Sequence, residues 1–110
     1  MIKSPPKNGV ILISTFSDEK SLIALSKRLI ADKRVCACVN YTTTKSIYVW
    51  NSKLYQESEF LAFFKTTSDL AEKLKTEIEN NHPYDVPEVV IIKMSDVSAG
   101  YFDWMHKNTH

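Results

Sequence analysis

The segment spanning residues 35–66 constrains the fold more than any other part of the chain. Residues 35–50 and 54–66 predict two long β-strands, because both arms are rich in β-branched and aromatic residues. Residues 51–53 are predicted to form the tight turn between them. At about 3.3 Å per residue the first arm would span roughly 50 Å, whereas a compact domain of this length has a diameter of about 35 Å. The hairpin therefore either bends sharply or extends beyond its own domain and pairs with something else.

The composition indicates one soluble globular domain. A chain of 110 residues can bury one hydrophobic core, and 44% hydrophobic with 25% charged residues is ordinary for this class. The net charge of +1 leaves no basic surplus to neutralise phosphates, so nucleic-acid binding is disfavoured. No apolar run reaches the roughly 18 residues of a membrane span, and no signal-peptide core is present. We expect a mobile lead-in over residues 1–8 and a single domain over residues 9–107.

The apolar and helical patterns alternate along the chain. Residues 9–15 and 89–92 are apolar runs typical of buried strands, and a helical pattern follows each of two similar starts, Ser17-Asp18 and Ser68-Asp69. Ser17 is the expected N-cap of the first helix. The order β-α-β-β-α-β indicates an α+β, ferredoxin-like sandwich, an antiparallel sheet with two helices on one face. Residues 101–105 are expected to add a C-terminal helical cap.

Both faces of the predicted sheet are apolar, although two helices cover only one. In the return arm Phe60 and Phe64 point to one face, and Leu61 and Phe63 point to the other. At roughly 25 cal/mol per Å², leaving the second face in water would forfeit several kcal/mol. This favours a homo-oligomer that covers the face. The alternative is that residues 101–105 fold back over it.

Several motifs spread along the chain form a specific signature. They are Ala37-Cys38-Val39-Asn40, Ser46-x-Tyr48-x-Trp50-x-x-Lys53, Glu59, Lys65-Thr66, the string from His82 to Glu88 (HPYDVPE), and Tyr101-x-x-Trp104. Together they resemble the CutA divalent-cation tolerance proteins, from about Val10 to Met105. The resemblance implies a ferredoxin-like protomer in a homotrimer whose long hairpins pair between subunits. Ser52 stands where the family usually has glycine, so a different turn type is expected there.

Two side chains could bind a soft or borderline metal ion. The thiolate of Cys38 and the imidazole of His82 are ligands that copper and zinc accept, and Cys36 would share one strand face with Cys38. A disulfide between these two cysteines would be strained, which favours a reducing compartment, the cytosol. The alternatives are that both cysteines are small buried hydrophobes and that His82 caps the preceding helix.

A second group of side chains is expected to form a polar cleft. Glu59 and Lys65 lie on one face of an otherwise apolar strand, where a charge must be paired or reach an opening. With Tyr84 and Glu88 they are candidates for a cleft between subunits. The alternative for Glu59 and Lys65 is a salt bridge at the rim of an interface.

The functional hypotheses follow from these sites. The chain lacks a nucleophile motif and a glycine-rich phosphate loop, so we expect no enzyme. The leading hypothesis is a cytoplasmic trimer that resembles CutA and is linked to divalent-cation tolerance. It would bind copper or another divalent cation weakly and require no cofactor. The alternatives are a small-molecule sensor resembling the PII-like trimers and a scaffold that anchors an unidentified partner protein.

Overall fold

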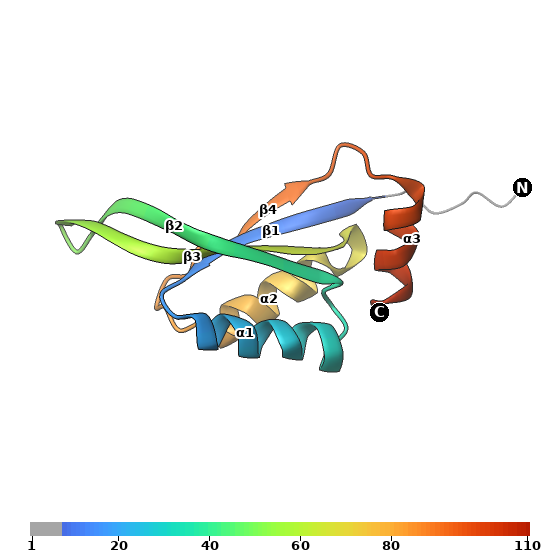
Figure 1. Ribbon diagram of the computed structural model, residues 1–110, viewed down its shortest axis with the longest axis horizontal. Helices are drawn as coiled ribbons and strands as arrows, with labels where there is room; N and C mark the ends of the chain where they lie inside the picture. Colours follow the sequence, from blue (N-terminus) through green and yellow to red (C-terminus); the bar gives the residue numbers. More distant parts are fainter. Residues whose placement is uncertain (1–7) are drawn as a thin grey trace, which may run out of the picture.

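The computed structural model describes residues 8–110 as one antiparallel sheet with two helices on one face and a third at one end (Figure 1). Its elements are β1 (Gly9–Phe16), α1 (Glu19–Lys27), β2 (Cys38–Trp50), β3 (Lys53–Thr67), α2 (Ala71–Asn81), β4 (Val90–Lys93) and α3 (Ala99–Lys107). A π-helical turn follows α1 and a 3₁₀ turn precedes α2. The predicted α+β class, element order and C-terminal helix are confirmed.

Only the end of the predicted lead-in belongs to the described residues. Residues 1–7 lie outside them. Asn8 is described, and its carbonyl oxygen accepts a hydrogen bond of 2.9 Å from the Ser68 N–H. This bond ties the start of β1 to the start of the turn that precedes α2.

The sheet has the strand order β2-β3-β1-β4, and each neighbouring pair is antiparallel. In β1 and β3, Leu12 pairs with Phe64 and Phe16 pairs with Phe60, so both pairs lie on the face toward the helices. The long strand β2 lies at one edge of the sheet and β4 at the other. The whole of β2 pairs only with β3, which leaves its other edge without a partner within the described chain.

The hydrophobic core lies between the sheet and the helices. Leu22, Leu25 and Leu29 from the first helical segment are buried, as their helical spacing predicted. The remaining buried core residues are Val10, Leu12, Phe16, Val35, Cys36, Ala62, Phe64, Ala71, Leu74 and Ile78. This packing fixes the end of β1, from which the loop to α1 begins.

The start of α1 differs from the prediction. The N-cap is Asp18, whose Oδ1 accepts a hydrogen bond of 2.9 Å from the Ser21 N–H, and not Ser17. A carboxylate at this position satisfies a free amide and also complements the positive end of the helix dipole. The end of α2 follows the expected rule, since the helix stops at Asn81, two residues before Pro83.

The hairpin extends beyond the rest of the molecule, as its length predicted (Figure 1). The principal extents are 58 × 27 × 21 Å and the radius of gyration is 15.3 Å, against about 13 Å for a compact domain of this length. The first arm begins later than predicted, because β2 starts at Cys38. Residues 35–37 precede it and are buried, and Ala37 donates its N–H to the Lys65 carbonyl.

The hairpin turn is shorter than predicted. Trp50 pairs with Lys53, so only Asn51 and Ser52 lie between the strands. Both have positive φ angles, 51° and 63°. Two central residues with positive φ are characteristic of a type I′ turn, whose twist matches that of the flanking strands. Asn51 suits this conformation well, whereas Ser52 carries a side chain in the left-handed region.

The second face of the sheet remains partly open. Leu61 and Phe63 are half-buried there, while Val90 and Ile92 of β4 are 46% and 44% exposed. The helix α3 lies at one end of the sheet, where Met105 is buried, and leaves the rest of this face uncovered (Figure 1). Residues 101–105 therefore fold over one end of this face, where Tyr101 lies against Lys65, and leave the rest open. None of the helices in residues 8–110 is long and apolar enough to cross a membrane.

Candidate functional site

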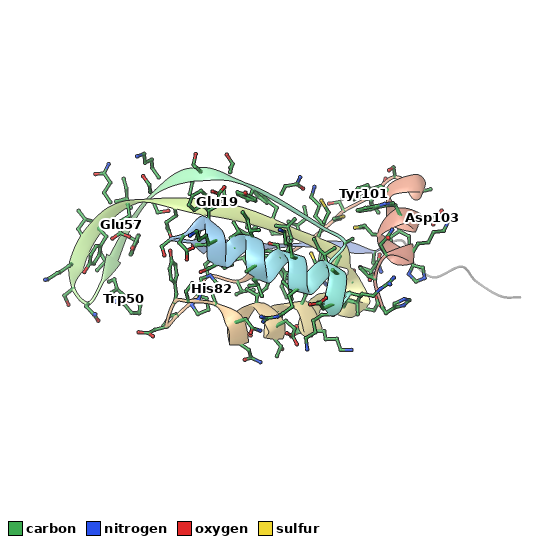
Figure 2. All side chains as sticks on the ribbon, turned by 60° about the horizontal axis from the view of Figure 1, so that its bottom comes forward. Glu19, Trp50, Glu57, His82, Tyr101 and Asp103 are labelled. Atoms are coloured by element: carbon green, nitrogen blue, oxygen red, sulfur yellow. The ribbon has the colours of Figure 1, made fainter. Side chains whose placement is uncertain are left out.

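A cleft opens between the protruding hairpin and the loop that connects α2 to β4. It has a volume of about 600 Å³. The hairpin contributes Ser46, Ile47, Tyr48, Trp50, Glu57 and Glu59, the loop contributes Tyr84, Asp85, Val86 and Glu88, and the end of β1 contributes Thr15 and Ser17. Trp50 and Glu57 come from the hairpin and His82 from the segment after α2 (Figure 2).

Tyr84 and Glu59 join the two walls of the cleft. The Tyr84 hydroxyl donates a hydrogen bond of 2.7 Å to Glu59 Oε2. Glu59 is buried, with 7% of its surface exposed. Burial and this bond to a carboxylate raise the pKa of Tyr84 well above its usual range, so the hydroxyl remains a donor. The bond fixes the loop at Tyr84 against the base of the hairpin.

His82 forms hydrogen bonds that hold the loop at Tyr84 against the end of β1. Its Nε2–H donates to the Thr15 carbonyl at 2.8 Å, and its Nδ1 accepts the Tyr84 N–H at 3.1 Å. The ring also stacks on Phe16, with centroids 4.2 Å apart. Burial lowers the pKa of His82, which favours the neutral imidazole that this pattern requires. Because both ring nitrogens are engaged, His82 positions the loop and offers no free nitrogen to a metal ion.

The charges around the cleft are of one sign. Four carboxylates line it, from Glu57, Glu59, Asp85 and Glu88, and no lysine or arginine of the described residues does. Tyr48 donates its hydroxyl to Glu57 at 3.0 Å, and this bond raises the pKa of Tyr48. A concave surface that carries only negative groups attracts cations and repels anions.

The structure brings together three of the predicted site residues and places the others elsewhere. Glu59, Tyr84 and Glu88 all line the cleft. Lys65 lies on the same face of β3 as Glu59, but six residues away, about 20 Å along the strand. Its Nζ lies over the ring of Tyr101, 6.0 Å from the centroid. Glu59 and Lys65 therefore do not meet within one chain, and their shared cleft between subunits stays a prediction.

Cys38 and His82 do not meet within one chain either. Cys38 pairs with Lys65, opposite Ile11 of β1, whereas His82 binds the carbonyl of Thr15, about 13 Å further along the same strand. No group of three or more His, Cys, Asp or Glu side chains in residues 8–110 could hold a metal ion. A joint site of Cys38 and His82 would need more than one copy of the chain.

The two cysteines have different environments. Cys36 precedes β2 and belongs to the core, where its thiol donates to the carbonyls of Cys38 and Lys65. Burial raises the pKa of Cys36 to about 12, so it stays a thiol. Cys38 is half-buried within the sheet, with its sulfur 3.6 Å from Asn40 Oδ1. The prediction that both cysteines share one strand face is wrong, because the strand begins only at Cys38.

Sequence reasoning overlooked part of the hairpin wall. Glu57 and Glu59 are two residues apart and so face the same side of β3, and Tyr48 pairs with the neighbouring Tyr55. This alternation could have identified Glu57. The contribution of Asp85 and Val86 depends on the course of the loop, which the strand and helix patterns do not specify.

Comparisons with known proteins agree on one family. A family model described as the CutA1 divalent ion tolerance protein matches residues 10–108. The divalent-cation tolerance protein CutA of Pyrococcus horikoshii is 36% identical over 100 residues, which are 91% of this chain and 97% of that protein. The corresponding protein of Thermus thermophilus is also 36% identical, over 91% of this chain and 96% of its own length.

Solved structures agree with the sequence matches. CutA1 from Pyrococcus horikoshii superposes with a TM-score of 0.88 at 36% identity, over 92% of this chain and 98% of that one. The divalent ion tolerance protein CutA1 from Ehrlichia chaffeensis gives a TM-score of 0.89 at 26% identity, over 96% and 99%. A neighbour from Archaeoglobus fulgidus, with a TM-score of 0.86 at 25% identity over 91% and 97%, is named a periplasmic divalent cation tolerance protein. The chain belongs to the CutA1 divalent ion tolerance protein family.

Proposed function

We propose that this chain supports divalent-cation tolerance as a cytoplasmic homotrimer with a ferredoxin-like protomer and without catalytic activity, and that it binds a cation weakly in the cleft. The observation that carries the proposal is the Tyr84–Glu59 pair, which holds a buried carboxylate in a cleft lined by three further carboxylates. Such a site favours positive ligands on electrostatic grounds alone. No bound cofactor is needed for this role.

The trimer is supported by the surfaces that one copy leaves exposed. Val90 and Ile92 lie on the open face, and Ile47, Val49 and Leu54 on the hairpin are 67–75% exposed. The edge strand β2 adds a row of amide and carbonyl groups that a second hairpin could pair with. Analytical ultracentrifugation at micromolar protein should give the mass of three chains. A well-folded single copy would contradict the proposal.

Copper or another divalent cation is the expected ligand class, at low affinity. Carboxylate oxygens are acceptable ligands for many divalent ions, but a single chain offers too few of them for a tight site. Calorimetric titration with Cu²⁺, Zn²⁺ and Mg²⁺ tests this. Glu59→Gln should weaken binding, whereas His82→Ala should retain the affinity of the wild type, because no nitrogen of His82 is free. Loss of Cu²⁺ binding in His82→Ala alone would instead restore His82 as a ligand.

A small-molecule sensor is the second candidate, because of the size of the cleft. A volume of about 600 Å³ lies within the range of roughly 300–1,000 Å³ that is usual for small-molecule sites and far exceeds the space of one ion. Thermal-shift measurements with divalent metals and with nucleotides separate the two candidates. The absence of lysine and arginine from the described lining predicts no stabilisation by nucleotides.

A further inference from the structure

Glu59 is the one buried carboxylate among the described residues that line the cleft. Its Oε2 accepts the Tyr84 hydroxyl, whereas Oε1 accepts no hydrogen bond from residues 8–110 and is accessible, since it is not among their fully buried unpartnered atoms. No lysine, arginine or histidine of these residues lies within 4.0 Å of the carboxylate. A carboxylate that is 7% exposed normally requires a positive partner. A positively charged ligand can reach Oε1 through the cleft, because Glu59 lines that cavity.

The rest of the cleft suits an organic cation better than a bare metal ion. Trp50 and Tyr48 provide an aromatic wall on the hairpin, and Val86 lies on the loop opposite. Aromatic faces attract ammonium groups and also bury the carbon atoms attached to them. A metal ion would need several oxygen ligands at once, whereas an ammonium group can bind one carboxylate through a single N–H and keep water on the others.

We propose that the cleft binds a small organic ammonium compound, with its charged nitrogen at Glu59 Oε1 and its apolar body against Trp50. The proposal rests on the proposed function and names the class of ligand for the same cleft. Glu57, Asp85 and Glu88 carry exposed carboxylates, which raise the local concentration of cations in the cleft around the buried Glu59.

The first test uses three compounds that share one phenylethyl skeleton. Phenethylammonium, 2-phenylethanol and phenylacetate differ in the charged group alone, and each is titrated calorimetrically into the full-length wild-type protein. Phenethylammonium should bind at least tenfold more tightly than 2-phenylethanol, and phenylacetate should not bind. The affinity for the ammonium compound should fall with added salt. Equal affinity for the ammonium compound and the alcohol overturns the proposal. So does the absence of phenethylammonium binding up to a concentration of 10 millimolar, about the weakest affinity that such a site could use.

The second test uses paired variants. Glu59→Gln should lower the affinity for phenethylammonium at least tenfold, because it removes the charge from the hydrogen bond. Glu79→Gln, an exposed position on α2 outside the cleft, should change it less than twofold. Trp50→Ala should weaken binding about threefold or more, and Trp104→Ala on α3 is its matched control. An unchanged affinity in Glu59→Gln overturns the assignment.

The mass of each variant and its Cu²⁺ titration distinguish the two proposals. If Glu59→Gln dissociates the trimer, a cationic side chain of a second copy is the partner of Glu59. That result overturns the ammonium site but still supports the proposed wild-type trimer. Binding of Cu²⁺ without binding of phenethylammonium would overturn the ammonium site and support the proposed metal function. Binding of neither cation would remove the cleft function altogether, and binding of phenethylammonium alone would support the inference and reject the metal.

Discussion

The hydrogen bond between Tyr84 and Glu59 should contribute measurably to stability. Tyr84→Phe removes the only hydrogen-bond donor that residues 8–110 give to the buried carboxylate of Glu59. Hydrogen bonds to charged groups contribute roughly 1.5–3 kcal/mol. Tyr84 itself is only half-buried, so we expect the lower end, about 1.5 kcal/mol. With a urea m-value of about 1–3 kcal/mol per molar, the unfolding midpoint should fall by roughly 0.5–1.5 M.

A double-mutant cycle isolates the contribution of the charge. In the Glu59→Gln background the acceptor is an uncharged amide oxygen, so Tyr84→Phe should cost only about 0.5–1 kcal/mol there. Tyr48→Phe is a matched control, since its hydroxyl donates to the exposed carboxylate of Glu57 at 3.0 Å. It should change stability by less than about 0.5 kcal/mol.

Urea unfolding followed by circular dichroism, at one fixed protein concentration, measures all four members of the cycle. The concentration must be fixed because association adds to the apparent stability. The reasoning fails if Tyr84→Phe costs the same with and without the Glu59 charge. It also fails if Tyr48→Phe is as costly as Tyr84→Phe, since the burial of Glu59 would then have no energetic effect.

Three further predictions concern the turn, the imidazole and a close contact. Ser52→Gly should raise the free energy of unfolding by about 0.5–1 kcal/mol, because Ser52 has φ 63°. Asn51→Gly should raise it by less, because asparagine tolerates positive φ better. An equal increase in both variants would contradict this. Burial lowers the pKa of His82 below 6.5, so the unfolded chain binds the proton first and stability should fall as the pH drops below about 6.5, less steeply in His82→Gln. Gly9→Ala should cost about 1 kcal/mol, because the new Cβ would lie 2.5 Å from Met94 Sδ; unfolding in a Met94→Ala background, where the cost should disappear, checks this.

The sequence predicted the elements whose residues repeat with a regular period. The alternation of Phe60 and Phe64 with Leu61 and Phe63 identified both faces of β3, because neighbouring side chains in a strand must point to opposite sides. The length of the hairpin predicted its extension beyond the domain. These features depend on local geometry, which the order of residues specifies directly.

The site was only partly predictable, because it depends on where a loop runs. Glu59 and Tyr84 were expected in one cleft, and the structure places them 2.7 Å apart. Lys65 was expected with them in a cleft between subunits, which stays a prediction; within one chain it lies about 20 Å from Glu59 along the strand. His82 was expected either as a metal ligand or as a structural residue that caps the preceding helix and donates to a carbonyl. Its actual role depends on the Thr15 carbonyl, which no sequence pattern brings near it.

The hairpin that forms one wall of the cleft is a two-stranded ribbon beyond the part of the sheet that the helices cover (Figure 1). A two-stranded ribbon has little rigidity of its own, so in the proposed trimer neighbouring copies would set its angle relative to the loop at Tyr84. Occupancy of the cleft and association of the chains would then be thermodynamically linked, and each would strengthen the other by the same factor. Dilution of the protein should therefore lower the affinity of the cleft for its ligand before any chain unfolds.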